Sequence, residues 1–143
     1  LRPNETDAPP FLKAAFAKAS QLQNILTNQF KENKTGNQIL AAALADAKQQ
    51  NIVASIYTHP IGYHGHAAGP TIGLWDQQSG VPGSGDFPMH FNTCYSIELN
   101  ASIAIAEWGK TIKMMLEQDG YFDQTGFRYI NGRQTEMHII GGK

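Results

Sequence analysis

The character of the chain changes near residue 51, and this change constrains the fold more than any other feature. Before it, apolar residues recur every three or four positions, which is the spacing of amphipathic helices. After it, short apolar runs alternate with frequent Gly and Pro, which is typical of short strands joined by turns. Two helices with one apolar face each need a sheet to cover. The pattern therefore predicts an α+β fold, with two long helices followed by a mainly antiparallel sheet.

Both helices have recognisable start signals. Asp7 can act as an N-cap ahead of two prolines, and the first helix is expected to run for about six turns. Thr35 and Gln38 have the spacing of a capping box at the start of the second helix. The expected organisation is one domain over residues 1–143, with a lead-in at 1–7, helices at 8–33 and 36–50, and a sheet and metal-ligand region at 51–143.

The second part contains several strand-like runs. They lie at residues 52–57, 91–99, 103–106, 111–116 and 127–130. A turn at 123–126 separates the last run from Tyr121 and Phe122. These runs supply the strands of the expected sheet.

Composition excludes several functional classes. The net charge of −1 and the pI of about 6.6 give no basic surface for nucleic acid or an anionic membrane. No apolar run approaches the ~18 residues of a membrane-spanning helix, so no membrane span is expected. A single cysteine, Cys94, rules out an internal disulfide and a multi-cysteine zinc motif. The cellular compartment stays open.

A loop rich in histidine is the first candidate for chemistry. His59, His64 and His66 fall within eight residues and are interleaved with Gly and Pro, which suits a loop better than a helix or a core strand. Imidazole is both a common metal ligand and the usual acid–base group near neutral pH. The alternative is a surface loop in which the histidines only form hydrogen bonds.

Two glutamates interrupt apolar strand runs. Glu98 follows Ile97, and Glu117 follows Leu116; a buried glutamate is costly unless it is paired or bound to a metal. Strand alternation places Glu98 on the face of Ser96. Carboxylate and imidazole together suit Mn²⁺, Fe²⁺, Co²⁺ or Zn²⁺. Taken singly, either glutamate could instead lie on a solvent-exposed face.

These residues together resemble the creatinase/methionine aminopeptidase superfamily, the "pita-bread" metallopeptidases that include aminopeptidase P and prolidase. The matching pattern is a His-x-x-Gly loop at His59, a second histidine seven residues later at His66, an apolar-Glu strand end at Glu98, and Glu117 nine residues before the turn glycine Gly126. Two long helices before the histidine loop match the C-terminal portion of the catalytic domain in that family.

The resemblance implies a role for each matched residue. His59, Glu98 and Glu117 would bind metal, with Glu117 bridging two ions and Glu98 also accepting a proton. His66 would contact the substrate carbonyl, and His64 would lie at the rim of the substrate site. The cofactors would be two divalent ions, Mn, Co or Zn. The activity would be that of an aminopeptidase or dipeptidase, a hydrolase that cleaves N-terminal, Xaa-Pro type bonds in a peptide substrate through a metal-activated water.

The sequence also departs from the family pattern. Two further aspartate ligands should precede the first helix, but only residues 1–7 lie there; Asp76 and Asp86 come in the wrong order and are expected to be loop residues. We therefore expect a partial catalytic domain whose N-terminal half is missing, with no metal bound by this chain alone. The expected partner is that half, and a homodimer is the alternative.

Three alternatives remain open at this point. The chain could be a non-catalytic pita-bread module that binds peptide or protein, or a mononuclear His/Glu zinc protein. Glu136 and His138 form a weaker candidate pair, because a strand Glu-x-His could also face the site. Relative to the family, residues 74–87 resemble an insertion.

Overall fold

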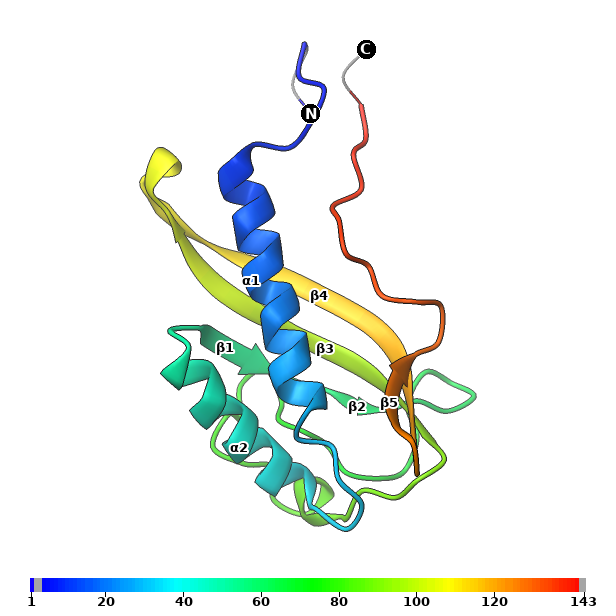
Figure 1. The fold of residues 1–143 in the computed structure, drawn as a ribbon. Coiled ribbons are helices and arrows are strands. Elements are labelled where there is room, and N and C mark those ends of the chain that lie inside the picture. The colour runs from blue at the N-terminus through cyan, green and yellow to red at the C-terminus, as the bar shows by residue number, and fades with distance from the viewer. Residues whose placement is uncertain (2–3, 142–143) are drawn as a thin grey trace.

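The computed structural model describes residue 1 and residues 4–141, and its order of elements is helices first and strands second (Figure 1). The elements are α1 (Pro10–Thr27), α2 (Gly36–Gln49), β1 (Val53–Ile56), β2 (His59–Pro60), the 3₁₀ turn η1 (Ser84–Asp86), β3 (Thr93–Ile105), the 3₁₀ turn η2 (Ala106–Trp108), β4 (Lys110–Asp123) and β5 (Gly126–Tyr129). The predicted α+β class is confirmed. Among the described residues, neither helix has the length and apolar character needed to cross a membrane.

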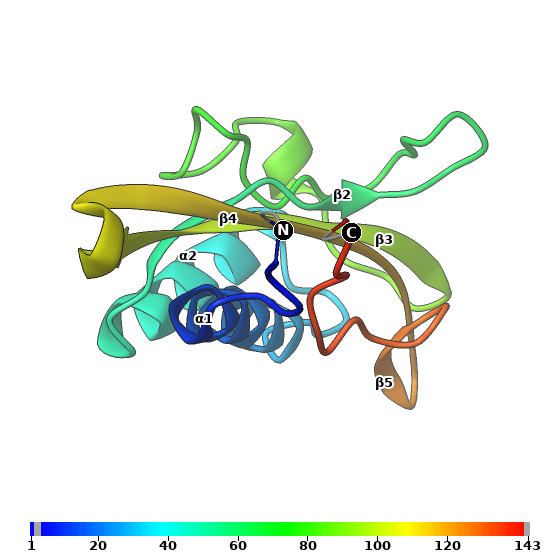
Figure 2. The same cartoon turned by 90° about the horizontal axis from the view of Figure 1, so that it is seen from above.

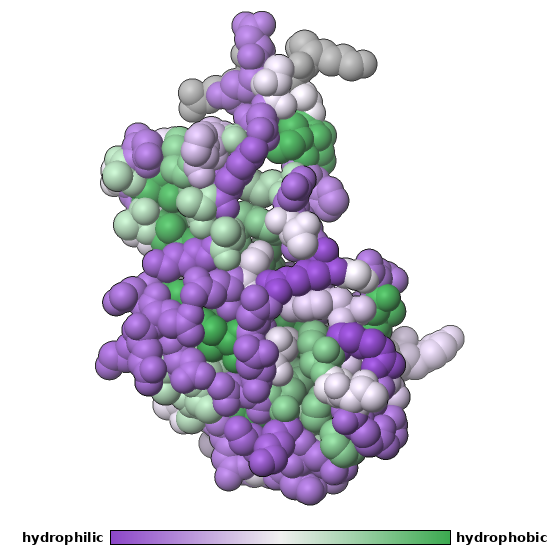
Figure 3. All heavy atoms as spheres, in the orientation of Figure 1, coloured by the Kyte–Doolittle hydropathy of each residue, from purple (hydrophilic) through white to green (hydrophobic). Residues whose placement is uncertain are grey.

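The sheet is antiparallel at every pairing between the named strands. Its order is β1-β3-β4-β5, and β2 pairs with β3 beyond the end of β1. Both helices pack on one face of the sheet, and parts of the segments between β2 and β3 rise on the other face (Figure 2). The molecule therefore has one apolar face closed by helices and one face left for loops and polar side chains. Seen from the helix side, hydrophilic residues dominate over α2, while apolar patches gather around the first turns of α1 (Figure 3).

The first helix is shorter than the predicted 8–33. Pro9 takes the N-cap position and Pro10 begins the helix, so the prediction of Asp7 as the cap was wrong. Asp7 instead accepts a hydrogen bond from the Ala8 N–H at 2.7 Å and pairs with Lys13. The helix ends at Thr27, because Thr and Asn at positions 27 and 28 are weak helix formers.

The second helix begins where the sequence predicts. The Gln38 N–H donates to the Thr35 hydroxyl at 3.2 Å, and the Thr35 N–H donates to the Gln38 side chain at 2.9 Å. Each of these bonds satisfies a backbone N–H that the first turn of a helix leaves without an internal partner. The predicted capping box is confirmed.

The central hairpin is longer than the sequence suggests. Residues 91–99 and 103–106 were expected to be two strands, but β3 is continuous and pairs with β4 from Thr93↔Phe122 to Ile105↔Lys110. The polar residues between the two runs looked like a break, yet they belong to the face without helices, where polar side chains are tolerated. The strand expected at 111–116 is also longer, because β4 runs from Lys110 through Asp123.

The core lies between the helices and the alternate residues of β3. Ile97, Leu99 and Ala101 are fully buried there, against Leu22 and Leu26 of α1. Their neighbours in the sequence therefore point to the opposite face.

The two edges of the sheet differ. At β1, the Gln78 side chain binds the Ile56 N–H at 2.9 Å and the Ile56 carbonyl at 2.7 Å, so it takes the place of a neighbouring strand. The outer edge of β4, which faces away from β3, is paired only at its C-terminal end. There β5 covers Gly120–Asp123, and the Ile130 N–H donates to the Asp119 carbonyl at 3.0 Å. Within the described part of the chain, residues 110–118 of β4 form no further strand pairing.

Candidate metal-ligand face

The face of the sheet opposite the helices gathers the residues singled out from the sequence. Glu98 of β3 lies directly opposite Glu117 of β4, and His59 of β2 lies opposite Ser96 of β3. Paired residues in an antiparallel sheet share a face. The structure thus brings His59, Glu98 and Glu117 onto one surface from three strands.

His59 faces the Glu98 carboxylate. The His59 Nε2 and Glu98 Oε2 atoms are 4.0 Å apart, and both side chains are largely covered, with 15% and 25% of their surface exposed. The other ring nitrogen, Nδ1, lies 2.9 Å from the Pro60 carbonyl oxygen. When Nδ1–H donates to that oxygen, the lone pair of Nε2 points toward Glu98. Such a hydrogen bond fixes the tautomer that metal-binding histidines need.

The surroundings of Glu98 disfavour its negative charge. Partial burial raises the pKa of Glu98, and the charge of Glu117 and a hydrogen bond with it raise it further; only His59 acts in the opposite direction. Glu117 is exposed and accepts a hydrogen bond from the Ser96 hydroxyl at 3.2 Å. Two adjacent carboxylates with an imidazole beside them form a surface whose repulsion a divalent cation would relieve.

The fit of these residues to a metal ion is partial. Imidazole nitrogen and carboxylate oxygen are suitable donors for Mn²⁺, Co²⁺ or Zn²⁺. However, the described residues contain no group of three His, Cys, Asp or Glu side chains close enough to hold an ion. The donor chemistry therefore fits, whereas the set of donors gathered here is incomplete.

His66 lies against His59, which the sequence did not predict. The two rings stack with centroids 3.9 Å apart and planes 9° apart. The loop is closed below them by a 3.0 Å hydrogen bond from the Ala67 N–H to the Pro60 carbonyl. His64 is exposed and meets Tyr63 edge-on at 4.9 Å. The loop thus brings His66 against His59, whereas His64 is exposed and contacts Tyr63.

The other acidic candidates have different places. Asp86 caps a turn by accepting from the Gly83 N–H at 3.0 Å, and Asp76 is exposed in the preceding loop, so both are loop residues as predicted. The strand expected for Glu136 and His138 is absent from the described C-terminal segment, which runs beside α1 (Figure 1). Because the helices and the glutamate pair lie on opposite faces, Glu136 and His138 do not join this site.

Two residues of this face were missed at the sequence level. Asp119 of β4 lies opposite Ser96, one row from Glu117. Tyr57 follows β1, and its hydroxyl accepts a long 3.5 Å hydrogen bond from the Asn100 side chain. Continuing the period-two alternation beyond Glu117 would have found Asp119, whereas nothing in the sequence signals the position of Tyr57.

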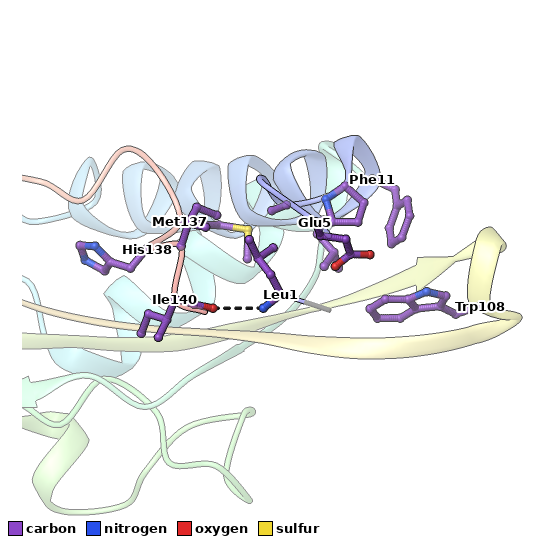
Figure 4. Close-up of a pocket in the computed structure, with 11 residues that line it drawn as sticks. Leu1, Glu5, Phe11, Trp108, Met137, His138 and Ile140 are labelled. Carbon is purple, nitrogen blue, oxygen red and sulfur yellow. Dashed lines mark hydrogen bonds between the residues drawn. The ribbon is translucent and has the colours of Figure 1, made fainter. Parts of the chain in front are cut away.

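A pocket of about 450 Å³ lies elsewhere, between the start of α1 and the C-terminal segment (Figure 4). Its walls include Phe11, Trp108 and Ile140, and the Leu1 amino group donates to the Ile140 carbonyl at 3.1 Å. It lies on the helix side of the sheet and contains none of the three candidate metal ligands.

Comparison with known proteins bears on the fold. No protein-family model and no curated protein matches this chain. Among solved structures, an X-Pro aminopeptidase from Thermotoga maritima MSB8 matches with a TM-score of 0.65 at 14% identity, over 94% of this chain and 35% of that chain. A Xaa-Pro dipeptidase from Bacillus anthracis matches with a TM-score of 0.62 at 18% identity, over 94% of this chain and 34% of that chain. The fold is that of part of a pita-bread protein.

The pita-bread fold alone does not identify the activity. The N-terminal domain of the FACT complex subunit SPT16 from chickpea, Cicer arietinum, matches with a TM-score of 0.66 at 12% identity, over 91% of this chain and 31% of that chain. The chain therefore spans about a third of the length of these three proteins. Peptidases and a FACT complex subunit match this fold about equally well, so the function has to be argued from the site.

Proposed function

We propose that the chain is part of a metal-dependent aminopeptidase or dipeptidase that hydrolyses N-terminal peptide bonds, of the Xaa-Pro type. The observation that carries the proposal is the placement of His59, Glu98 and Glu117 on one face by three strands. A purely structural sheet face has no physical need for two adjacent carboxylates facing an imidazole. The peptidase titles of two structural matches agree with it.

The residues can be given roles in such a reaction. His59, Glu98 and Glu117 would hold divalent ions, Mn, Co or Zn, which when bound polarise a carbonyl and make a bound water more acidic. The raised pKa of Glu98 suits a carboxylate that accepts a proton from the attacking water. His66, on the exposed side of His59, would donate a hydrogen bond to the substrate carbonyl oxygen. His64 would remain at the rim.

The site needs further ligands to bind two ions. Three donors are too few. Glu117 itself lies on the stretch of β4 whose outer edge is unpaired. A strand added along this edge would place its own side chains next to Glu117 on the same face. We propose that the aspartate-bearing half of the domain pairs here, and that a second copy of the chain is the alternative partner.

Metal titration with matched variants tests the proposal. In a sample that contains both halves of the domain, Glu117→Ala should abolish high-affinity Mn²⁺ binding measured by calorimetry. The control Glu136→Ala should leave it unchanged, because Glu136 lies in the C-terminal segment on the other side of the sheet. Equal binding by both variants would contradict the metal role of Glu117.

A non-catalytic binding module is the second candidate. It is favoured by the match to the SPT16 domain and by the incomplete donor set. Hydrolysis of a Leu-Pro peptide with added Mn²⁺ separates the two, since a binding module would bind the peptide and leave it intact. A mononuclear zinc protein would require this chain alone to bind about one zinc per molecule, which the same titration measures.

A further inference from the structure

The most exposed aromatic side chains outside the chain ends all lie in the long connection between β2 and β3. Tyr63, Trp75 and Phe87 have 98%, 78% and 56% of their surface exposed. All three belong to the segments between β2 and β3, and parts of these segments rise on the face opposite the helices (Figure 2). This is also the face of His59, Glu98 and Glu117. Phe87 lies instead beside the start of α2, where its carbonyl accepts the Gly36 N–H at 3.3 Å. A tryptophan with most of its surface exposed is unusual, and tryptophan is enriched where proteins bind partners, so Trp75 is a candidate binding residue.

Trp75 lies at the tip of a turn that is held rigidly. Leu74 and Gln77 exchange two backbone hydrogen bonds, at 3.3 and 2.9 Å. The Gln78 amide donates to the Leu74 carbonyl at 2.6 Å and also binds both backbone groups of Ile56. The turn is therefore fastened to the end of β1, and Trp75 is held in place without being packed into the core.

A second amide side chain fixes the rest of this loop. Asn37 of α2 accepts a hydrogen bond from the Val81 N–H at 2.7 Å and donates to the Val81 carbonyl at 3.2 Å. It also donates to the Asp86 carboxylate at 2.8 Å. At Gly85 there is no room for a side chain, because a Cβ atom would lie 2.3 Å from the Asn37 amide oxygen. The loop is thus a built structure, and little ordering entropy is lost when a ligand contacts it.

The turn is connected to the candidate site through β1. Tyr57 follows Ile56, the residue that Gln78 holds, and the Tyr57 N–H donates to the Glu98 carbonyl at 3.1 Å. Two residues later the chain reaches His59. Residues 56–59 therefore contact the turn that carries Trp75 through Ile56, and they reach the metal-ligand face through Tyr57 and His59.

We propose that Trp75 is a docking platform for the peptide substrate and stacks on an apolar ring side chain, such as proline, of a peptide whose free amino group lies at the Glu98–Glu117 face. The inference rests on the proposed function and extends it to a residue outside the matched family motifs. In the metal-free chain, charge supports this occupant: Glu98, Glu117 and Asp119 outnumber Lys113 on one face and attract an ammonium group. Tryptophan provides a rigid apolar surface of the kind that proline-containing peptides bind.

Tryptophan fluorescence of the chain tests the proposal. The chain has two tryptophans, and Trp108→Phe leaves Trp75 as the only emitter. Addition of the peptide Leu-Pro-Leu-Ala should protect Trp75 from acrylamide quenching, and the N-acetylated peptide should bind at least tenfold more weakly. Unchanged quenching of Trp75 at peptide concentrations up to the solubility limit would overturn the proposal.

Calorimetry with variants provides the second readout. Trp75→Ala should weaken binding of the same peptide about tenfold or more, whereas Trp75→Phe should retain affinity within about threefold. The control Trp108→Phe should bind like the original chain, because Trp108 lies on the helix side against Phe11. Because Trp75 is exposed, its variants should unfold at the same urea concentration as the original chain. Equal affinity of Trp75→Ala and the original chain would refute the docking role.

The failure of this proposal can be told apart from failure of the proposed function. If the completed domain neither binds Mn²⁺ nor cleaves the peptide, while Trp75-dependent binding persists, the chain is a peptide-binding module and only the peptidase proposal falls. If Mn²⁺-dependent cleavage is seen and Trp75→Ala leaves KM and kcat unchanged, the peptidase proposal stands and the docking role falls.

Discussion

Glu98 shows how one residue can make the stability of this fold depend on pH. Its pKa is raised above the ordinary value of about 4.5, so the folded chain binds a proton more tightly than the unfolded chain. Between the two pKa values the native state holds more protons, and stability therefore falls as pH rises through that window. Glu98→Gln removes this loss. In metal-free protein, the variant should be more stable than the original chain at pH 7 and similar to it at pH 4.

Urea unfolding at both pH values measures this difference. Glu107→Gln, on the exposed tip of the hairpin, is a suitable control and should change little at either pH. If Glu98→Gln lowered stability more at pH 7 than at pH 4, the burial of the Glu98 charge beside Glu117 would not be the dominant effect.

Only part of the site could be predicted at this scale. The alternation of β3 indicates that Glu98 and Ser96 share a face, and the structure confirms it. That Glu98 lies opposite Glu117 depends on the hairpin register, which is set by the turn through η2 and Gly109 and has no clear signal in the sequence. The stacking of His59 on His66 depends on how a glycine-rich loop folds back, and local sequence does not determine that.

The capping box is the clearest prediction at the level of elements. Thr35→Ala removes the hydroxyl that accepts the Gln38 N–H at the start of α2. It should lower the free energy of unfolding by about 1 kcal/mol, the usual effect of losing such a cap. Urea denaturation measures the change, and Thr135→Ala, an exposed threonine in the C-terminal segment, is the control. No difference between the two variants would mean that solvent satisfies the Gln38 N–H as well as the Thr35 hydroxyl does.

Gln78 should matter more for β1 than its place in a loop suggests. Gln78→Ala removes three hydrogen bonds and leaves the Ile56 N–H without its partner. We expect a loss of about 1–3 kcal/mol in stability, together with faster hydrogen exchange at Ile56. The matched control is Gln77→Ala, since Gln77 holds the turn through its backbone. Slow exchange at Ile56 in the Gln78 variant would show that β1 does not need this side chain.

Helix and strand types could be predicted, but several of their ends could not. Periodicity identifies both helices, and the capping box gives the start of α2. The end of α1 was misplaced because Phe30 continues the apolar stripe while lying outside the helix, where it packs edge-on against Tyr95. The local sequence at Thr27 and Asn28 ends the helix, and a long-range contact with Tyr95 determines where Phe30 lies.

At the scale of the whole molecule, the unpaired part of β4 should govern association. An exposed strand edge offers unpaired backbone N–H and C=O groups to other strands. Met115 lies on this stretch with 66% of its surface exposed. For the 143-residue chain alone, we expect concentration-dependent self-association in analytical ultracentrifugation, and Met115→Lys should weaken it at least several-fold.

Ile130→Lys is the control for that experiment. Ile130 has 54% of its surface exposed but follows β5 instead of lying on the open stretch of β4. Equal association of both variants would indicate that a different surface joins the molecules.

The long β3–β4 hairpin also limits how the sequence can change. Because side chains alternate between faces, the single register that aligns Glu98 with Glu117 also puts Leu99 opposite Leu116 in the core. A one-residue deletion in either strand, between the Glu98–Glu117 pair and the hairpin tip, would shift the register by one residue. Glu117 would then point into the core and Leu116 out of it. Insertions and deletions between the two glutamates should therefore be tolerated only at the η2–Gly109 tip. Any lineage that keeps the core packing of this hairpin also keeps the two carboxylates aligned, whether or not they are used.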